Sequence, residues 1–311
     1  MRSRLVPIVT ALLVLAVPGT ALAEGSLEEY LSAMASSDFH GRGLTVCSWE
    51  GESAGAVYEV TRSEGMTMVS GTGGDVMTMG GTTAMRSGAG WHGFAIAGAA
   101  PWTMSGRYVM SDPVATERLG RPATLTTLLQ DGMPRVEIVA DDATGAPLLV
   151  QVRDGSGAVF RVSALLEVSP AAPMEAARMG EMGDMAVMEA AEAPDRFPAE
   201  TSGYRRADAY TAGDAGLHVY YSDGLFSFSV FEAKRGAPPD GLAAASVWKV
   251  AGREYRRLVT PAHVWVHWNG PDHSYLLVGD LPPDHLERVL EDLPEPGERS
   301  LLVRLWRRLF G

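Results

Sequence analysis

The sequence has little cysteine and little asparagine, and each shortage excludes a class of structure. A single cysteine, Cys47, excludes a disulfide framework and any zinc cluster built on cysteines. The only asparagine, Asn269, is followed by Gly-Pro, so the chain has no N-glycosylation acceptor. A formal charge of −12 argues against non-specific nucleic-acid binding, which needs clustered cations. What remains is globular: 46% of the residues are hydrophobic and 21% are charged.

Long hydrophobic runs are lacking too, apart from one near the start. Arg2 and Arg4 precede the 13-residue apolar run 5–17, and Ala-Leu-Ala at 21–23 is a small-x-small cleavage site. Because a membrane span needs about 20 residues, we predict a signal peptide that is cleaved after Ala23. A retained anchor is the alternative. Export places the mature chain in the periplasm or cell envelope, where we expect Cys47 to be a buried thiol rather than an intermolecular bridge.

The first part of the mature chain has the pattern of one helix followed by many strands. Ser26 and Glu29 form a capping box, which predicts a helix over 26–37. From Phe39 the hydrophobic period changes to two. Strands are predicted at 39–49, 56–62, 66–70, 76–79, 91–96, 107–110, 123–130, 135–141, 148–153 and 159–168. Such a meander must bury one face, and the helix is the available cover.

A composition change separates this part from a second unit. Residues 169–202 are rich in Ala, Pro, Glu and Met, which predicts a linker. Its methionines stand at helical spacing, but no His or Cys accompanies them, so a partly helical linker is favoured over a metal site. Residues 203–293 have the pattern of a smaller α+β unit that ends in a helix at 284–293. Its strands are predicted at 217–221, 225–233, 246–250, 254–259, 263–268 and 275–278.

The C-terminal tail, residues 294–311, contains a basic amphipathic helix at 301–310. Leucines, Trp306 and Phe310 occupy one side, and Arg304, Arg307 and Arg308 occupy the other. This pattern suits the surface of an anionic membrane. Docking of the tail on the acidic body of the same chain is the alternative, because ten residues form a marginal helix without a packing surface.

Motifs for catalysis are weak. Gly88–Gly93 matches G-x-G-x-x-G, but strand-like surroundings and Pro101 favour a hairpin loop over a dinucleotide site. His263 and His267 lie on one face of a strand but about 13 Å apart, too far for both to bind one zinc, so ordinary surface or interface histidines are favoured. We therefore expect no enzyme and no cofactor.

Several motifs occur in the order found in a known family. The stretch 120–168 begins with Gly-Arg-Pro, continues with Asp-x-x-Thr-Gly-x-Pro-Leu at 141–148 and has Asp-x-x-Gly at 154–157. Phe39-His40-Gly41 matches an aromatic-x-Gly entry to a first strand. Tyr-Ser-Asp-Gly-Leu stands at 221–225, and 279–293 has the pattern of a final strand and helix. Over most of 28–293 the chain resembles the RseB/MucB family of regulators of extracytoplasmic sigma factors.

The resemblance implies an α+β fold in two domains. The first would be a LolA-like curved antiparallel half-barrel with a helix, and the second a smaller antiparallel sheet with a helix. The expected organisation is a signal peptide at 1–23, the half-barrel at 24–168, the linker at 169–202, the second domain at 203–293 and the tail at 294–311.

The resemblance also implies a function. Members bind a membrane anti-sigma factor and shield it from proteolysis, so a lipid or lipoprotein that releases the regulator triggers an envelope stress response. A lipid or lipoprotein carrier is the alternative. The residues expected to line an acyl-chain cavity are Trp49, Tyr58, Met66, Met68, Met77, Met79 and Trp91. The residues expected to contact the partner are Tyr221, Asp223, Leu225 and Phe226.

Overall fold

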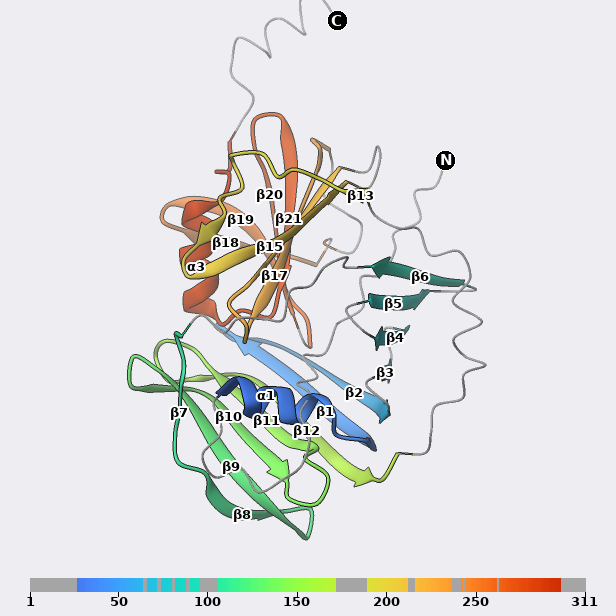
Figure 1. Cartoon of the computed structure of the whole chain (residues 1–311). Coiled ribbons are helices and arrows are strands. Elements are labelled where there is room, and N and C mark those ends of the chain that lie inside the picture. The colour runs from blue at the N-terminus through green and yellow to red at the C-terminus, as the bar shows by residue number, and fades with distance from the viewer. Residues whose placement is uncertain are drawn as a thin grey trace, which may run out of the picture. The chain divides into compact units, whose positions relative to one another are not determined.

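The structure, a computed structural model, describes residues 27–63, 66–71, 74–79, 82–87, 90–95, 106–171, 189–211, 216–236, 242, 244–261 and 263–297. Within residues 74–95 it describes the backbone alone. The chain forms two compact units, which divide between the described stretches that end at residue 171 and begin at residue 189, except that residues 260–262 group with the first unit. Each unit is built on one antiparallel sheet (Figure 1).

The first sheet has 12 strands in the order β6-β5-β4-β3-β2-β1-β12-β11-β10-β9-β7, with β8 paired to β9. Sequential hairpins build it, and the pairing of β1 with β12 joins the two halves of the meander. The strands are β1 (Phe39–Trp49), β2 (Glu52–Ser63), β3 (Met66–Gly71), β4 (Gly74–Met79), β5 (Thr82–Ser87), β6 (Gly90–Ala95), β7 (Val109–Met110), β8 (Val114–Arg118), β9 (Arg121–Gln130), β10 (Met133–Asp141), β11 (Pro147–Arg153) and β12 (Val159–Ser169).

This sheet is curved and open (Figure 1). Register shifts interrupt the pairing of β1 with β12, of β10 with its two neighbours, and of β11 with β12. Such bulges bend a strand and increase its twist. Gly43 allows a close approach between β1 and β2: the ring of Tyr58 lies over it, and a Cβ at Gly43 would stand 2.5 Å from the Tyr58 Cζ. A side chain larger than hydrogen therefore has no room there.

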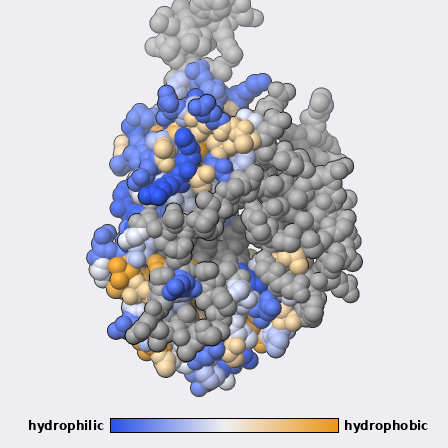
Figure 2. All heavy atoms as spheres, in the orientation of Figure 1, coloured by the Kyte–Doolittle hydropathy of each residue, from blue (hydrophilic) through white to orange (hydrophobic). Residues whose placement is uncertain are grey.

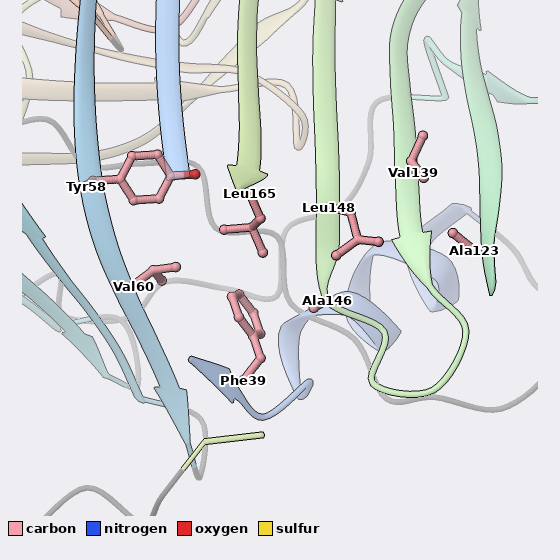
Figure 3. Packing of buried hydrophobic residues seen from close by; sticks show 8 residues of the cluster. All are labelled: Phe39, Tyr58, Val60, Ala123, Val139, Ala146, Leu148 and Leu165. Atoms are coloured by element: carbon pink, nitrogen blue, oxygen red, sulfur yellow. The ribbon is translucent and has the colours of Figure 1, made fainter. Parts of the chain in front are cut away.

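One face of the first sheet holds the core. Its buried cluster contains Phe39, Tyr58, Val60, Ala123, Val139, Ala146, Leu148 and Leu165, whose side chains Figure 3 shows together. Helix α1 (Leu27–Ala35) contributes Tyr30, Leu31 and Met34, all buried. Arg62 of β2 fixes the end of this helix, because its Nη1 donates to the Met34 carbonyl at 2.9 Å. The predicted role of the helix as a cover for the sheet fits this arrangement.

The second sheet has nine strands. Its main path runs β13-β15-β16-β17-β21-β20-β19-β18, and β14 pairs with β15. The strands are β13 (Glu189–Ala190), β14 (Glu200–Thr201), β15 (Tyr204–Thr211), β16 (Leu217–Ser222), β17 (Ser227–Lys234), β18 (Ser246–Val250), β19 (Arg253–Val259), β20 (Val264–Asn269) and β21 (His273–Gly279).

Helix α3 (Pro283–Asp292) closes the second unit. Pro283 stands in its first turn, where a missing N–H costs nothing, and Leu286, Val289 and Leu290 are buried. The hydroxyl of Tyr204 and the Nδ1 of His285 form a hydrogen bond of 2.7 Å, which ties β15 to the helix. Paired valines and leucines on four central strands form an apolar row beside it: Val219, Val230, Leu277 and Val266.

The predicted α+β class with a curved antiparallel first sheet is confirmed. The sequence pattern did not predict β5, β8 or the strands β13 to β15. The sequence pattern placed residues 189–202 in the linker. In the structure, β13 and β14 lie within this stretch and pair with β15 of the second sheet. The signal peptide, residues 172–188 of the linker and residues 298–311 of the tail lie outside the described residues.

Candidate functional site

The residues expected to line a ligand cavity come from five strands of the first sheet and fall into two groups. Tyr58 belongs to the core cluster, beside Val60 and Leu165 (Figure 3). Burial raises the pKa of the Tyr58 phenol to about 12. Trp49 is also buried, and its ring meets Phe160 edge-on at 6.1 Å. Trp49 and Tyr58 lie on the face of the sheet that carries Phe39, because β1 and β2 pair without a register shift.

Cys47 lies on that same face and is fully buried. Burial raises the pKa of its thiol to about 11, although the charge of Arg161 on the paired strand opposes the shift. The prediction of a buried thiol is confirmed. The thiolate is the reactive form of cysteine. Because Cys47 is fully buried and its pKa is raised, its thiol is protonated at neutral pH and is not reactive while the sheet is intact.

The methionines lie on the opposite face. Val60 pairs with Val69 and Thr61 pairs with Met68, and successive residues of a strand point to opposite faces. Position 66 is on the face of position 68, and the register carries this face to positions 77, 79 and 91. Met66 is buried and Met68 is half-buried, whereas the side chains at 77, 79 and 91 lie outside the description. The seven residues expected to line one cavity are therefore divided between the two faces of the sheet. A cavity on either face can be lined by only one of the two groups.

The Tyr-Ser-Asp-Gly-Leu signature forms the turn between β16 and β17. Asp223 Oδ1 accepts hydrogen bonds from the backbone N–H groups of Leu225 and Phe226, at 3.0 and 2.8 Å. Gly224 has a φ of 92°, which favours glycine. The ring of Tyr221 stacks on Phe228 with centroids 4.8 Å apart.

All four residues expected to contact a partner are buried in this turn. Tyr221, Asp223, Leu225 and Phe226 each expose 2% of their surface or less. Their interpretation as partner contacts does not fit this burial, because a docking protein meets exposed side chains. The signature instead stabilises the turn between β16 and β17.

Two histidines of the second sheet, His218 and His267, have lowered pKa values. His267 exposes 3% of its surface, so its interpretation as an ordinary surface or interface histidine does not fit the structure. Burial lowers its pKa, and the charge of Arg256 adds to the shift. His218 stacks on Phe231 at 4.5 Å, and burial lowers its pKa to about 4. Its Nε2 bonds to the Ser229 hydroxyl at 2.8 Å.

The sequence did not reveal a cluster of charged residues in which Arg196 binds Glu232 of the second sheet. Both carboxylate oxygens of the buried Glu232 accept hydrogen bonds from Arg196, at 2.7 and 2.5 Å. His273 Nε2 lies 3.7 Å from the same carboxylate. These residues are far apart in the sequence, and no local motif marks them.

Other functional features are absent from the described part of the chain. No group of three or more His, Cys, Asp or Glu side chains there could hold a metal ion. None of the helices described is long and apolar enough to span a membrane. Among the described residues, the exposed large apolar side chains lie in the first unit, apart from Val247 in the second, and Figure 2 shows apolar residues in small groups among hydrophilic ones. The tail residues Arg304, Trp306, Arg307, Arg308 and Phe310 lie outside the description.

Comparison with known proteins gives a match in structure but none in sequence. No protein-family model matches the chain. A search of the curated proteins finds no match either. The complex structure of Pseudomonas aeruginosa MucA/MucB matches with a TM-score of 0.51 and 17% identity, over 86% of this chain and 95% of that chain. A crystal structure of MucB matches with a TM-score of 0.51 and 19% identity, over 84% and 94%. The chain therefore has the fold of MucB, as the sequence resemblance to the RseB/MucB family predicted.

Proposed function

We propose that this chain is an exported regulatory binding protein. It engages the extracytoplasmic segment of a membrane anti-sigma factor and thereby controls the release of an extracytoplasmic-function sigma factor. The observation that carries the proposal is the fold shared with MucB over most of both chains, since MucB has been solved in complex with MucA. The proposal also includes export by a signal peptide at residues 1–23.

The test is a binding measurement with the mature chain, residues 24–311. Extracytoplasmic segments of the membrane anti-sigma factors encoded in the same genome are immobilised one at a time, and binding is followed by interferometry. We expect one segment to bind saturably and to be cleaved more slowly by a protease when bound. If folded protein binds none of them, or if bound segment is cleaved at the free rate, the proposal is overturned.

We further propose that the regulator senses an envelope lipid or lipoprotein through the core face of the first sheet. Support comes from the apolar side chains gathered there around Phe39, Tyr58 and Leu165. Concave apolar surfaces with few polar groups are the usual sites for apolar ligands. Native mass spectrometry of protein from envelope extracts should show a bound lipid. Tyr58→Ala should lose this lipid, whereas Met68→Leu, on the opposite face, should retain it.

A lipid or lipoprotein carrier is the second candidate, favoured by the same apolar face. The two functions differ in what the lipid does. For a regulator, added lipid lowers the affinity for the anti-sigma segment. For a carrier, lipid moves from the chain to acceptor vesicles and the segment has no effect. One experiment with a labelled lipid, acceptor vesicles and the segment distinguishes the two.

For the tail we propose contact with an anionic membrane surface through Arg304, Arg307 and Arg308, with Trp306 and Phe310 in the interface. Deletion of residues 299–311 should reduce binding to anionic vesicles, and the reduction should be smaller at high salt because salt screens the arginines. Equal vesicle binding by the full and shortened chains would remove this role and leave docking on the chain itself.

A further inference from the structure

Strands β15 to β17 of the second sheet carry a group of polar and aromatic side chains on one face. In the pairing of β15 with β16, Tyr210 is the partner of His218, and Asp208 stands two residues before Tyr210 on the same strand. On the other side of β16, Phe231 of β17 is the partner of His218. Paired positions share a face of a sheet, as do positions i and i+2 of one strand. The face therefore carries a continuous array of four side chains: Asp208, Tyr210, His218 and Phe231.

The imidazole of His218 is fixed at the centre of this array. Its centroid lies 4.5 Å from that of Phe231, with an interplanar angle of 13°, and 5.8 Å from that of Tyr210. Its Nε2 and the hydroxyl of Ser229 form a hydrogen bond of 2.8 Å. Burial lowers the pKa of His218 to about 4, so the ring is neutral at pH 7. In the tautomer whose Nε2 donates to Ser229, Nδ1 presents a lone pair.

Three polar atoms of the array are buried without a hydrogen-bond partner in the described part of the chain: Asp208 Oδ2, the Tyr210 phenol oxygen and His218 Nδ1. Tyr210 exposes only 2% of its surface. Burial raises the pKa of its phenol, and the nearby Asp208 carboxylate raises it further, although the two groups form no hydrogen bond of ordinary geometry. Buried polar atoms are normally paired, so three of them at neighbouring positions indicate a site that bonds to another molecule.

All three atoms can accept a hydrogen bond. A carboxylate oxygen only accepts, Nδ1 accepts in the tautomer described, and a phenol oxygen has lone pairs for a donor. The complementary group therefore donates three hydrogen bonds and carries a positive charge that offsets the charge of Asp208. A primary ammonium has three N–H donors and no acceptor. In the described residues no group of three or more His, Cys, Asp or Glu side chains could hold a metal ion, which favours an ammonium over a metal.

We propose that Asp208, Tyr210 and His218 form a binding site for a primary ammonium group, and that a lysine side chain of a partner protein carries this group. The formal charge of −12 on the chain attracts a basic partner. An ethanolamine head group has the same ammonium, but an acidic chain repels the phosphate beside it. Phe231 is half-buried, and its exposed part offers apolar surface to the methylene stem of a lysine. The partner need not be an anti-sigma factor, so this site does not depend on the proposed function.

The test follows the ring signals of His218 by NMR in the folded mature chain, residues 24–311, and His218→Gln assigns these signals. The probe is Nα-acetyl-lysine methylamide. We expect saturable shifts with a Kd on the order of a millimolar, as for a small isolated ligand group. Acetyl-norleucine methylamide lacks the ammonium and tetramethylammonium lacks N–H donors, so neither should shift the signals. Phosphoethanolamine should bind more weakly than the lysine probe.

Two variants test the acceptors. Asp208→Asn removes the negative charge and Tyr210→Phe removes the phenol oxygen, and each should weaken binding of the lysine probe roughly tenfold. The matched control is Glu254→Gln, which removes an exposed carboxylate from β19 of the same sheet and should bind as the unmodified chain does. Circular dichroism establishes that the variants are folded, and one folded variant of the two is sufficient.

Several outcomes would overturn the proposal. If the site receives only water, the lysine probe leaves the His218 signals unchanged. If charge alone attracts the probe, tetramethylammonium gives equal shifts. Unchanged binding by the folded variants would place the ammonium elsewhere on the chain. Tighter binding of phosphoethanolamine than of the lysine probe would overturn the assignment to a lysine. The comparison of the probes requires no variant, and none of these measurements involves an anti-sigma segment.

Discussion

Both units bury arginine, but among the described residues the second unit buries histidine as well. In the first sheet, Arg62 and Arg161 expose 1% and 6% of their surfaces. In the second unit, Arg257 of the sheet exposes 3%, and it is joined by two buried histidines, His267 of the sheet at 3% and His285 of helix α3 at 0%. A guanidinium stays charged at every physiological pH, so a buried arginine needs hydrogen-bond acceptors that stabilise its permanent charge. An imidazole can be buried in its neutral form, and its burial then becomes costly in acid. The difference predicts unlike responses of the two sheets to mutation and to pH.

The largest expected effect tests the buried arginine of the first sheet. Arg62 donates to the Met34 carbonyl and to the Thr67 hydroxyl, both at 2.9 Å, and lies over the Phe39 ring. Burial lowers its pKa to about 10, against the charge of Asp38, so it remains charged at pH 7. Arg62→Ala should lower the free energy of unfolding by about 3–5 kcal/mol, because it leaves a cavity and an unanchored helix end.

The matched control for Arg62 is Arg42→Ala on the neighbouring strand. Arg42 pairs with Glu167 at 3.3 Å, but both side chains are more than half exposed. Such a surface pair contributes about 0–1 kcal/mol. Urea unfolding of the two variants measures the difference, and similar losses would show that burial of the guanidinium does not matter.

The next prediction tests the histidines of the second sheet. The folded-state pKa of His218, about 4 because of burial, lies below the unfolded value of about 6.5. The stabilisation that neutral His218 gives the folded state is therefore complete above pH 6.5. As the pH falls from 6.5 towards 4, the free energy of unfolding decreases by roughly 3 kcal/mol. His218→Gln should flatten the stability profile in this window. His40→Gln, an exposed position of the first sheet, should leave the profile as it is. Urea midpoints between pH 4 and pH 7 give the comparison.

The strands that the sequence predicted are those with clear alternation. β1 and β10 to β12 have long runs of period two, and the structure places strands there. Strand β8 was missed because no buried residue alternates along it: Val114 to Glu117 are all exposed. β15 was missed because a bulge between Arg206 and Asp208 breaks its period. The alternation of one strand is a local property, whereas edge strands and bulged strands depend on their neighbours.

The candidate site was predictable in composition but not in arrangement. The sequence marked the methionines of β3 and β4 and the aromatic residues Trp49 and Tyr58. Which face each group takes depends on the register of β2 with β3, and a shift of one residue exchanges the faces. The role of Asp223 was unpredictable for another reason: a turn signature looks the same whether its side chains face a partner or the core.

The third prediction compares one buried carboxylate from each sheet. Asp141 accepts hydrogen bonds from Arg121 at 2.7 and 3.0 Å and from the N–H and hydroxyl of Thr144 at 2.9 and 2.7 Å. Burial acts to raise its pKa, but these bonds and the charge of Arg121 outweigh burial and lower it. Asp141→Asn should cost about 2 kcal/mol at pH 7, because hydrogen bonds to a charged group are lost.

Asp141 and Asp223 should respond differently to substitution by asparagine. Since the pKa of Asp141 is lowered, its contribution is present above the ordinary carboxyl pKa and is lost as the pH falls below it. Asp223 accepts from two backbone N–H groups, and an asparagine oxygen can still accept them, so Asp223→Asn should cost about 1 kcal/mol. A larger loss for Asp223→Asn than for Asp141→Asn would reverse this order.

The smallest effect concerns the ion pair between Arg196 and Glu232. Arg196 binds a carboxylate whose side chain is 8% exposed, but its own side chain is 40% exposed, so solvent screens part of the interaction. Arg196→Gln should lower the stability by about 1 kcal/mol at low salt. Arg253→Gln, which breaks a pair with the exposed Glu295, should have almost no effect. Because salt screens exposed charges more strongly, the Arg196 loss should persist at high salt when the Arg253 loss has vanished. Equal salt dependence of the two variants would mean that the burial of Glu232 gives its pair no advantage over a surface pair.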